Sequence, residues 1–354
     1  MNITLTNKRI SGILSVVPKN RVRFLDEIEN YGFSREKSLK LQETIGLDER
    51  RIVSGDACGS DLCEFGLRYL FERGLLSPDE IGAIVLVTQT PDHFMPPTST
   101  ILHGKLGLGR EVLCFDINHG CTGYLYGLLQ AFMLLQLSDV GKVVLLNADT
   151  LSRRCSPRDR NVYPLIGDAG TVTVVENTDD DSKIFLNLRT DGSRFDWLII
   201  PAGAFRMPST EETRRIRVLP DGNRRSDEDY HMNGAGVFTF TQTDVAAGIK
   251  QVFEYASMET GDIDYFMFHQ PNRFMLTKLA KKLGVPVEKM PNNIVEKFGN
   301  SSSACIPVAI CHNISRLLLR QKLRICMSGF GVGLTWGALI MDVGPLEFCE
   351  LIER

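Results

Sequence analysis

Apolar runs and amphipathic stretches follow one another along the chain and predict strands and helices in regular succession. Residues 61–73 have the apolar spacing of a helix, whereas residues 83–89, "AIVLVTQ", form a continuous apolar run typical of a strand. The succession continues with a helix over residues 101–106, a strand over 111–118, a helix over 123–137 and a strand over 142–149. Continuous apolar strands between helices indicate a parallel sheet covered on both faces. We therefore expect an α/β fold.

The second half of the chain repeats this order of elements. Helices are predicted over residues 243–256, 273–284 and 304–319, and strands over residues 262–270 and 322–331. Ile81 and Ile263 begin corresponding strands 182 positions apart, and Lys142 and Lys322 are 180 positions apart. A period this long predicts two copies of a domain rather than a solenoid. We expect an N-terminal half over residues 1–180 and a C-terminal half over residues 181–354.

Composition excludes several classes of protein. With 43% hydrophobic residues and a net charge of -3, the chain resembles an ordinary globular protein and lacks the basic surface of a nucleic-acid binder. Its apolar start is too short for a signal peptide, and no apolar segment is long enough to span a membrane. The nine cysteines match no zinc spacing, and no metal site is predicted. We expect free thiols in the cytoplasm.

The motif "CFDINHGCTGYLYGL" places the thiol of Cys121 between the end of a predicted strand and the start of a predicted helix. Unpaired N–H groups and the positive end of the helix dipole favour the thiolate of Cys121, which predicts a lowered pKa. Gly120 and Gly123 permit a tight turn and close approach of a substrate. His119, two residues away in such a turn, is not expected to face the thiol. The alternative is that Cys121 is a buried structural cysteine.

Two polar residues of the second half are candidate partners of Cys121. His269 ends the strand over residues 262–270, and Asn300 lies in the turn "FGNSSSA" before a helix. Because ligand sites lie beyond the carboxyl ends of strands and between domains, these residues are expected to converge on one cleft. His103 and His312 lie on predicted helices and are not candidate partners of Cys121.

Two other kinds of site were considered from spacing alone. A papain-like protease is suggested because His269 follows Cys121 by 148 residues, but "HGCTG" lacks the second cysteine and the aromatic neighbour of that pattern. The G-x-G of "GFGVG" suggests a nucleotide site, but an apolar strand follows it where a dinucleotide fold needs a helix. Neither alternative accounts for the duplicated frame.

Four motifs in order carry a resemblance to a known family. "FDINHGCTGYLYGL", "HQPNRFM", "FGNSSSACIPVAI" and "GFGVGLTWGALI" resemble the β-ketoacyl-acyl carrier protein synthase III family of the thiolase superfamily, over about residues 45–342. The resemblance implies a thiolase-like fold with layered α-β-α-β-α architecture, usually a homodimer. It also implies an acyltransferase with no bound cofactor, whose substrates are acyl-CoA or acyl carrier protein thioesters.

The family's reaction implies a role for each candidate residue. Cys121 takes an acyl group from a thioester, and His269 and Asn300 hold the carbonyl of malonyl-acyl carrier protein while carbon dioxide leaves. The carbanion then attacks the acyl-cysteine and yields a 3-oxoacyl thioester, as in fatty acid biosynthesis. By the same resemblance, the backbone N–H groups of Cys121 and Val332 form an oxyanion hole.

Further positions follow from the resemblance. Met95, Arg160 and Phe330 match substrate-binding positions, and Lys281 and Lys282 match positions that meet acyl carrier protein. For the two lysines, a solvated helix face is the alternative.

The chain departs from the family at the adenine clasp of CoA-using members. Lys40 and Thr44 stand where those members have a tryptophan and an arginine. A thioether at Met95, where relatives have a phenylalanine, is more adaptable than a ring. We therefore expect a primer longer than acetyl, carried by CoA or by acyl carrier protein.

Two other functions are compatible with the same motifs. The protein could pass the acyl group from Cys121 to an amine or alcohol, or it could be a non-catalytic subunit that binds acyl carrier protein. Retention of Asn300 beside Cys121 and His269 favours the condensation.

Overall fold

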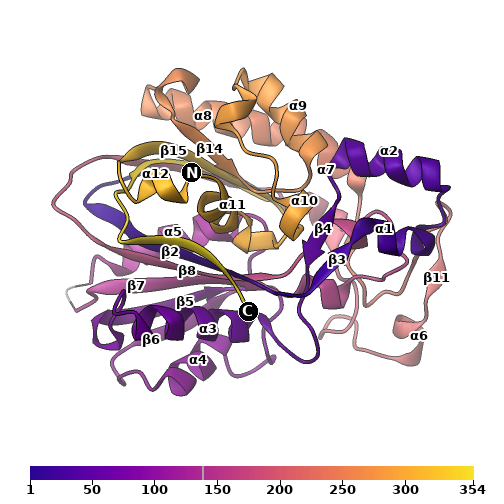
Figure 1. The fold of residues 1–354 in the computed structure, drawn as a ribbon, viewed down its shortest axis with the longest axis horizontal. Helices are drawn as coiled ribbons and strands as arrows, with labels where there is room; N and C mark the ends of the chain where they lie inside the picture. The colour runs from indigo at the N-terminus through magenta and orange to yellow at the C-terminus, as the bar shows by residue number, and fades with distance from the viewer. Residues whose placement is uncertain (138) are drawn as a thin grey trace.

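Two mixed β-sheets organise the chain in the computed structural model, which describes residues 1–137 and 139–354 (Figure 1). The first sheet has the strand order β17 (Phe348–Glu353), β2 (Lys8–Val17), β8 (Ala169–Asn177), β7 (Lys142–Asp149), β5 (Ile81–Val87) and β6 (Leu113–Ile117). The second sheet has the order β1 (Asn2–Leu5), β9 (Ile184–Thr190), β16 (Thr335–Val343), β15 (Leu323–Gly331) and β14 (Tyr265–Phe268). The predicted strands are therefore present in both halves.

The two sheets repeat one pattern of strand pairing. β5 and β7 are parallel, as are β14 and β15, and β7–β8 and β15–β16 are both antiparallel. The next pairs, β8–β2 and β16–β9, are also antiparallel. This topology supports the internal duplication. The strands from which a parallel sheet was predicted do pair in parallel, β5 with β6 and β7, and β14 with β15. Each sheet then continues through antiparallel strands, which the sequence did not predict, because an apolar run reports burial but not strand direction.

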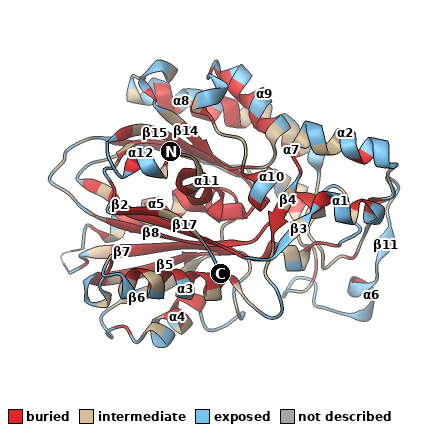
Figure 2. Cartoon of the chain, in the orientation of Figure 1, coloured by how far each residue is buried: buried red, intermediate tan, exposed pale blue. Residues whose placement is uncertain are grey.

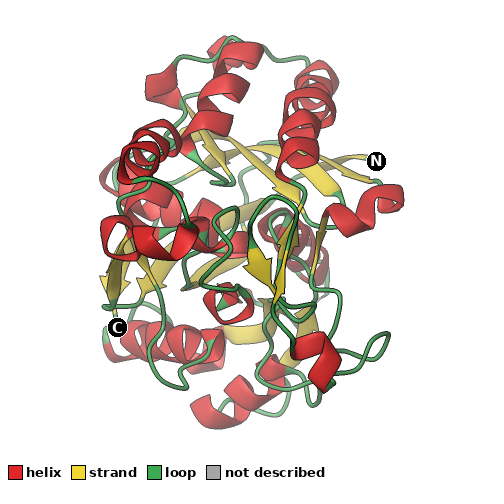
Figure 3. Ribbon diagram, turned by 90° about the vertical axis from the view of Figure 1, so that its right-hand side faces the viewer, coloured by secondary structure: helices red, strands yellow, loops and turns green. Residues whose placement is uncertain are grey.

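Two buried helices separate the sheets. α5 (Gly123–Leu134) and α11 (Cys305–Asn313) lie between them, with α3 (Gly59–Glu72) and α4 (Thr98–Leu106) outside the first sheet and α8 (Ala246–Ala256) and α9 (Arg273–Leu283) outside the second (Figures 1 and 3). A helix that is apolar on all sides, such as "GYLYGLLQAFML", is stable only when buried. The predicted α-β-α-β-α layering is confirmed.

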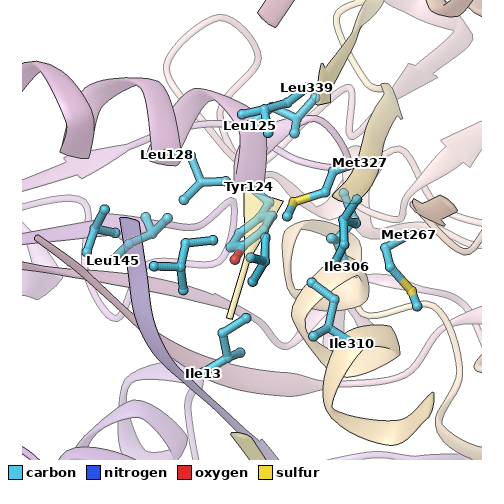
Figure 4. Close-up of a cluster of buried hydrophobic side chains, with 14 of the residues drawn as sticks. Ile13, Tyr124, Leu125, Leu128, Leu145, Met267, Ile306, Ile310, Met327 and Leu339 are labelled. Atoms are coloured by element: carbon cyan, nitrogen blue, oxygen red, sulfur yellow. The ribbon is translucent and has the colours of Figure 1, made fainter. Parts of the chain in front are cut away.

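The core between the sheets is built around α5 and α11. Tyr124, 0% exposed, packs among aliphatic side chains of both helices and both sheets, including Leu145, Ile310 and Met327 (Figure 4). At Gly127 an added Cβ would lie 2.5 Å from a methyl carbon of Leu145, so only glycine lets α5 approach β7 this closely. This packing fixes where α5 begins.

The terminal strands tie the halves together. β1, at the N-terminus, pairs with β9 of the second sheet, and β17, near the C-terminus, pairs with β2 of the first. The predicted boundary at residue 180 falls in the connection between β8 and β9.

The remaining elements gather at the end of the sandwich shown on the right in Figure 1. They are α1 (Phe24–Glu27), α2 (Arg35–Ile45), α6 (Glu211–Arg214), α7 (Gly234–Phe240) and α10 (Val295–Phe298), with the paired strands β3 (Arg21–Arg23) and β4 (Glu49–Arg51), β10 (Leu198–Ile199) and β13 (His231–Met232), and β11 (Arg217–Val218) and β12 (Arg224–Arg225). Figure 2 shows that α2 and α6 are largely exposed, whereas the sheets are buried.

The structure divides one predicted helix into two. The helix predicted over residues 304–319 is broken, because α11 ends at Asn313 and α12 (Ser315–Leu318) follows it. Within the described ranges, every helix is too short or too polar to cross a membrane. All nine cysteines are free thiols, as predicted.

Candidate active site

Both central helices begin at the same end of the sandwich. Cys121 stands two residues before α5, and Asn300 precedes α11. The Asn300 segment is held against the first half by backbone hydrogen bonds, from the Asn300 N–H to the Leu165 carbonyl at 2.7 Å and from the Gly167 N–H to the Asn300 carbonyl at 3.1 Å. Cys121, Asn300 and Val332 line one cavity of about 790 Å³. The duplication thus brings Cys121 and Asn300 to one site, whereas the buried His269 is not among the residues that line this cavity, so its contact with substrate stays a prediction.

The Cys121 sulfur is enclosed by the turn that follows β15. An added Cβ on Gly331 would lie 2.8 Å from the sulfur, so this position accepts only glycine, which also suits its φ of +155°. Backbone groups of Val332 and of Cys121 itself lie close enough to the sulfur to oppose the rise of its pKa. Thr335 fixes the turn, with its Oγ1 2.8 Å from the Val332 carbonyl. The backbone of both residues predicted for the oxyanion hole therefore lies at the sulfur, and the oxyanion hole itself stays a prediction.

The protonation state of Cys121 differs from the sequence prediction. Burial raises the pKa of the thiol to about 12, the nearby Cys305 also raises it, and the backbone hydrogen bond from Val332 opposes them. The predicted lowering at a helix N-terminus is therefore wrong in direction, because the cost of burying a thiolate exceeds the stabilisation by nearby N–H groups. The resting residue is a thiol, and it must lose its proton as it attacks.

His269 lies where β14 ends, as predicted. Its backbone N–H donates to the Ser328 carbonyl at 2.8 Å, and its imidazole ring meets the Phe330 ring edge-on with centroids 5.5 Å apart. Burial lowers the pKa of His269 to about 3, opposed by a backbone hydrogen bond of Ser302. Nδ1 has no hydrogen-bond partner in the described part of the chain. The ring is therefore neutral and can donate one N–H.

The side-chain amide of Asn300 has a fixed orientation. Its Oδ1 accepts hydrogen bonds from the Ser302 N–H at 3.0 Å and from the Cys305 thiol at 3.2 Å. Ser302 adopts a φ of +55°, an uncommon conformation for a residue with a side chain. Because Oδ1 is occupied, Nδ2 remains as the donor that a substrate oxygen can use.

Other residues considered from the sequence take different places. His119 stacks on Tyr126 with ring centroids 4.0 Å apart, which accounts for its turning from the thiol. Phe330 packs on His269 and does not line the cavity, and Met95 is 78% exposed, so their contacts with substrate stay predictions. Lys281 lies in the last turn of α9 and, like Lys282, is exposed.

Sequence reasoning missed an aromatic partner for Arg160. The Arg160 guanidinium lies 4.5 Å from the centroid of the Phe33 ring, and the Lys37 ammonium lies 4.0 Å from the same ring. The prediction looked for an aromatic clasp only at Lys40 and Thr44. The signal was the aromatic residue in "YGFSREK", just before α2.

Sequence reasoning also missed the ionisable neighbours of Cys121. Asp149, 0% exposed at the end of β7, accepts a hydrogen bond from the Gln89 N–H at 2.7 Å. Burial raises the pKa of Asp149 to about 6, opposed first by that bond. Cys305 is likewise buried, and burial raises its pKa to about 11. Asp149 and Cys305 lie far from Cys121 in sequence, and the fold brings them close enough to raise the pKa of its thiol.

Comparison with known proteins gives one consistent result. Residues 115–192 match the family profile of 3-oxoacyl-[acyl-carrier-protein] synthase III, and residues 253–343 match the profile of its C-terminal part. A β-ketoacyl-[acyl-carrier-protein] synthase III of Clostridium perfringens is 32% identical over 96% of this chain and 100% of its own length.

Solved structures agree with the sequence matches. The crystal structure of a 3-oxoacyl-(acyl-carrier protein) synthase from Burkholderia xenovorans has a TM-score of 0.92 and 33% identity, covering 100% of this chain and 99% of that one. A 3-oxoacyl-(acyl-carrier-protein) synthase III has a TM-score of 0.88 and 32% identity, covering 95% of this chain and 99% of that one.

Proposed function

Because the chain belongs to the 3-oxoacyl-[acyl-carrier-protein] synthase III family, we propose that it joins an acyl thioester to malonyl-acyl carrier protein through an acyl-Cys121 intermediate. One observation carries the proposal. Cys121, with two backbone groups at its sulfur, and Asn300, with its Nδ2 available, line the same cavity.

The first step forms a thioester bond between Cys121 and the acyl group. The sulfur attacks the acyl carbonyl, whose oxygen becomes negatively charged and is stabilised by the N–H groups of Val332 and Cys121. The carrier sulfur then leaves and receives the proton that the Cys121 thiol gives up. The raised pKa of Cys121 favours this direction of transfer. The carrier thiolate, a base of ordinary strength, is a better leaving group than the more basic Cys121 thiolate.

The second step forms the carbon–carbon bond. Loss of carbon dioxide from the malonyl thioester leaves an electron pair delocalised onto the thioester oxygen, where His269 and Asn300 donate hydrogen bonds. The carbanion attacks the acyl carbonyl, the bond to the Cys121 sulfur breaks, and a 3-oxoacyl thioester leaves. The released Cys121 thiolate takes a proton from water and returns to the resting thiol. Passing the acyl group to an amine would leave the amide of Asn300 and the imidazole of His269 without a task.

Several finer points belong to the proposal. The primer arrives on CoA or on acyl carrier protein, and the Arg160–Phe33 pair supports an interaction with CoA. Lys281 and Lys282 offer exposed positive charge to an acidic carrier protein. We also propose a cytoplasmic homodimer in which the exposed Met95 reaches the partner's acyl cavity.

Mass spectrometry with isotope-labelled substrate tests the proposal. Incubation with hexanoyl-CoA should add one acyl group at Cys121, and labelled malonyl-acyl carrier protein should then release labelled carbon dioxide and yield a 3-oxoacyl product. Acylation followed by transfer to an added amine, with no loss of carbon dioxide, would overturn the condensation. Absence of acylation with every thioester tested would overturn the enzyme assignment.

A further inference from the structure

The wall of the active-site cavity includes an arginine that the reaction above does not use. Arg154 lies in the connection after β7, is half-buried, and lines the cavity together with Cys121 and Tyr230. Its carbonyl accepts a hydrogen bond from the Tyr230 N–H at 2.6 Å, which ties the connection to the segment before β13. The backbone that carries this arginine is therefore held in place.

The Arg154 guanidinium lies beside a glycine that also lines the cavity. A Cβ added to Gly203 would come within 3.7 Å of Nη2 and 3.8 Å of Nη1, at a backbone φ of +98°. Gly203 itself lines the cavity, so the guanidinium is at the cavity wall. A glycine here leaves both terminal nitrogens uncovered by a side chain on that side.

Within the described part of the chain, the Arg154 guanidinium forms no direct ion pair with a carboxylate. Among the described residues, Arg154 has no carboxylate within 4.0 Å and its side chain donates no hydrogen bond. Hydrogen bonds from Ser209 and Thr213 lower the pKa of the nearby Glu228, and the charges of Arg214 and Arg154 add to this effect. The Glu228 carboxylate accepts the Thr213 bond at 2.7 Å and makes no ion pair with Arg154. By contrast, the half-buried Arg225 pairs with Asp159 at 2.7 Å and the buried Arg50 pairs with Glu27 at 2.8 Å.

Asp116 is the carboxylate residue in the described cavity wall, and its oxygens are engaged by groups other than Arg154. Both oxygens of Asp116 are occupied by backbone N–H groups, that of Thr98 at 2.6 Å and that of Ser99 at 2.9 Å. These donors belong to the first turn of α4, whose dipole also favours a negative charge. A guanidinium without a direct carboxylate partner among the described residues therefore remains at the wall of the cavity that Cys121 also lines.

We propose that Arg154 binds a carboxylate at the far end of the acyl primer, so that the preferred acyl donor is the half-thioester of a dicarboxylic acid. This inference rests on the proposed function. Apolar residues of the same wall, Leu198, Ile199 and Ile200, suit the methylene chain between the thioester and the carboxylate. The malonyl carboxylate is excluded as the ligand, because an ion pair would stabilise the group that must leave as carbon dioxide.

The test compares donors of equal length that differ in the terminal group. Adipyl- and hexanoyl-CoA should acylate Cys121 with kcat/KM values that favour the adipyl donor by at least about tenfold, the range of a charge-assisted hydrogen bond. Arg154→Met should lower that preference by about 10- to 100-fold, mainly by weakening acylation with adipyl-CoA, and Arg154→Lys should retain part of it.

Arg153 supplies the matched control. It is the adjacent arginine, but it is exposed and its Nη2 donates to the Gly55 carbonyl at 2.7 Å, away from the cavity lining. Arg153→Met should leave the preference unchanged. An equal loss in this variant, or a wild-type enzyme that favours the hexanoyl donor, would overturn the inference while leaving the condensation intact.

A second pair of donors separates the carboxylate from a phosphate of the carrier. Adipyl and hexanoyl thioesters of N-acetylcysteamine carry no phosphate, and the preference for adipyl and its loss in Arg154→Met should persist with them. If the effect of Arg154→Met appears only with CoA donors and is equal for both acyl groups, Arg154 binds phosphate and the inference is wrong. If no thioester acylates Cys121, the proposed function fails with it.

Discussion

The two halves of the molecule share one frame but carry different chemistry at matching places. Gly123 begins α5 and Cys305 begins α11, 182 positions apart, the same separation as between Ile81 and Ile263. Before the first helix stands a thiol, and before the second stands an amide whose orientation is fixed by its neighbours. The two halves therefore place two buried helix N-termini at one site, and the proposed function assigns the nucleophile to the first and a hydrogen-bond donor to the second.

The halves differ in residue type but agree in charge. Burial raises the pKa of Cys121 to about 12 and lowers the pKa of His269 to about 3, so both are neutral near pH 7. In the proposed reaction, negative charge then develops on substrate oxygens, which preorganised hydrogen-bond donors stabilise. The predictions below test whether the two halves divide the reaction in this way.

The largest effect is expected for Cys121→Ala. Without the sulfur, acylation and condensation should be abolished, whereas slow decarboxylation of malonyl-acyl carrier protein should remain, because His269 and Asn300 are unchanged. Mass spectrometry of the acylated protein and release of labelled carbon dioxide measure the two activities separately.

Cys305→Ala is the control for this variant. Cys305 is also buried and lies beside the Asn300 amide, so its removal should leave acylation at Cys121 in place. An acyl group found on another cysteine of Cys121→Ala, together with undiminished turnover, would contradict the assignment of the nucleophile.

Asn300→Ala should reverse the pattern. The variant loses one of two donors to the developing charge, so decarboxylation should fall by about 10²–10³. Self-acylation at Cys121 should stay within a few-fold of wild type, and Asn300→Asp, which keeps the shape but not the donor, should resemble Asn300→Ala. Equal losses in acylation and decarboxylation would show that the halves do not divide the work.

The order of helices and strands could be predicted from the sequence better than the pKa of the buried thiol, for physical reasons. Apolar runs depend on local burial, so the strand predicted over residues 83–89 is close to the observed β5 (Ile81–Val87). The pKa of Cys121 depends on how completely the folded chain excludes water, which no local pattern reports. Likewise, Arg154 lies beside Gly203, far away in sequence, and the aromatic residue before α2 gave no indication that Arg160 would lie over it.

The raised pKa of Cys121 predicts a distinctive pH dependence. Below a pKa of about 12, the thiolate fraction rises about tenfold per pH unit. Alkylation of Cys121 by iodoacetamide should therefore accelerate about 100-fold between pH 7 and pH 9 without a plateau. Rates measured against the Cys121→Ala protein isolate this residue from the other thiols. A plateau below pH 8 would mean that the helix terminus, not burial, sets the pKa.

The smallest effect concerns how the N-terminal half receives its donor. If Arg160 and Phe33 bind the nucleotide of CoA, Phe33→Ala should raise KM for acyl-CoA about two- to fivefold, as expected for one exposed cation–π contact. The variant should leave KM for N-acetylcysteamine thioesters unchanged, because these lack the nucleotide. Lys40→Ala is the matched control at the position that the resemblance assigned to the clasp, and it should change neither value. A larger effect of Lys40→Ala than of Phe33→Ala would return the clasp to that position and leave the Arg160–Phe33 contact as local packing.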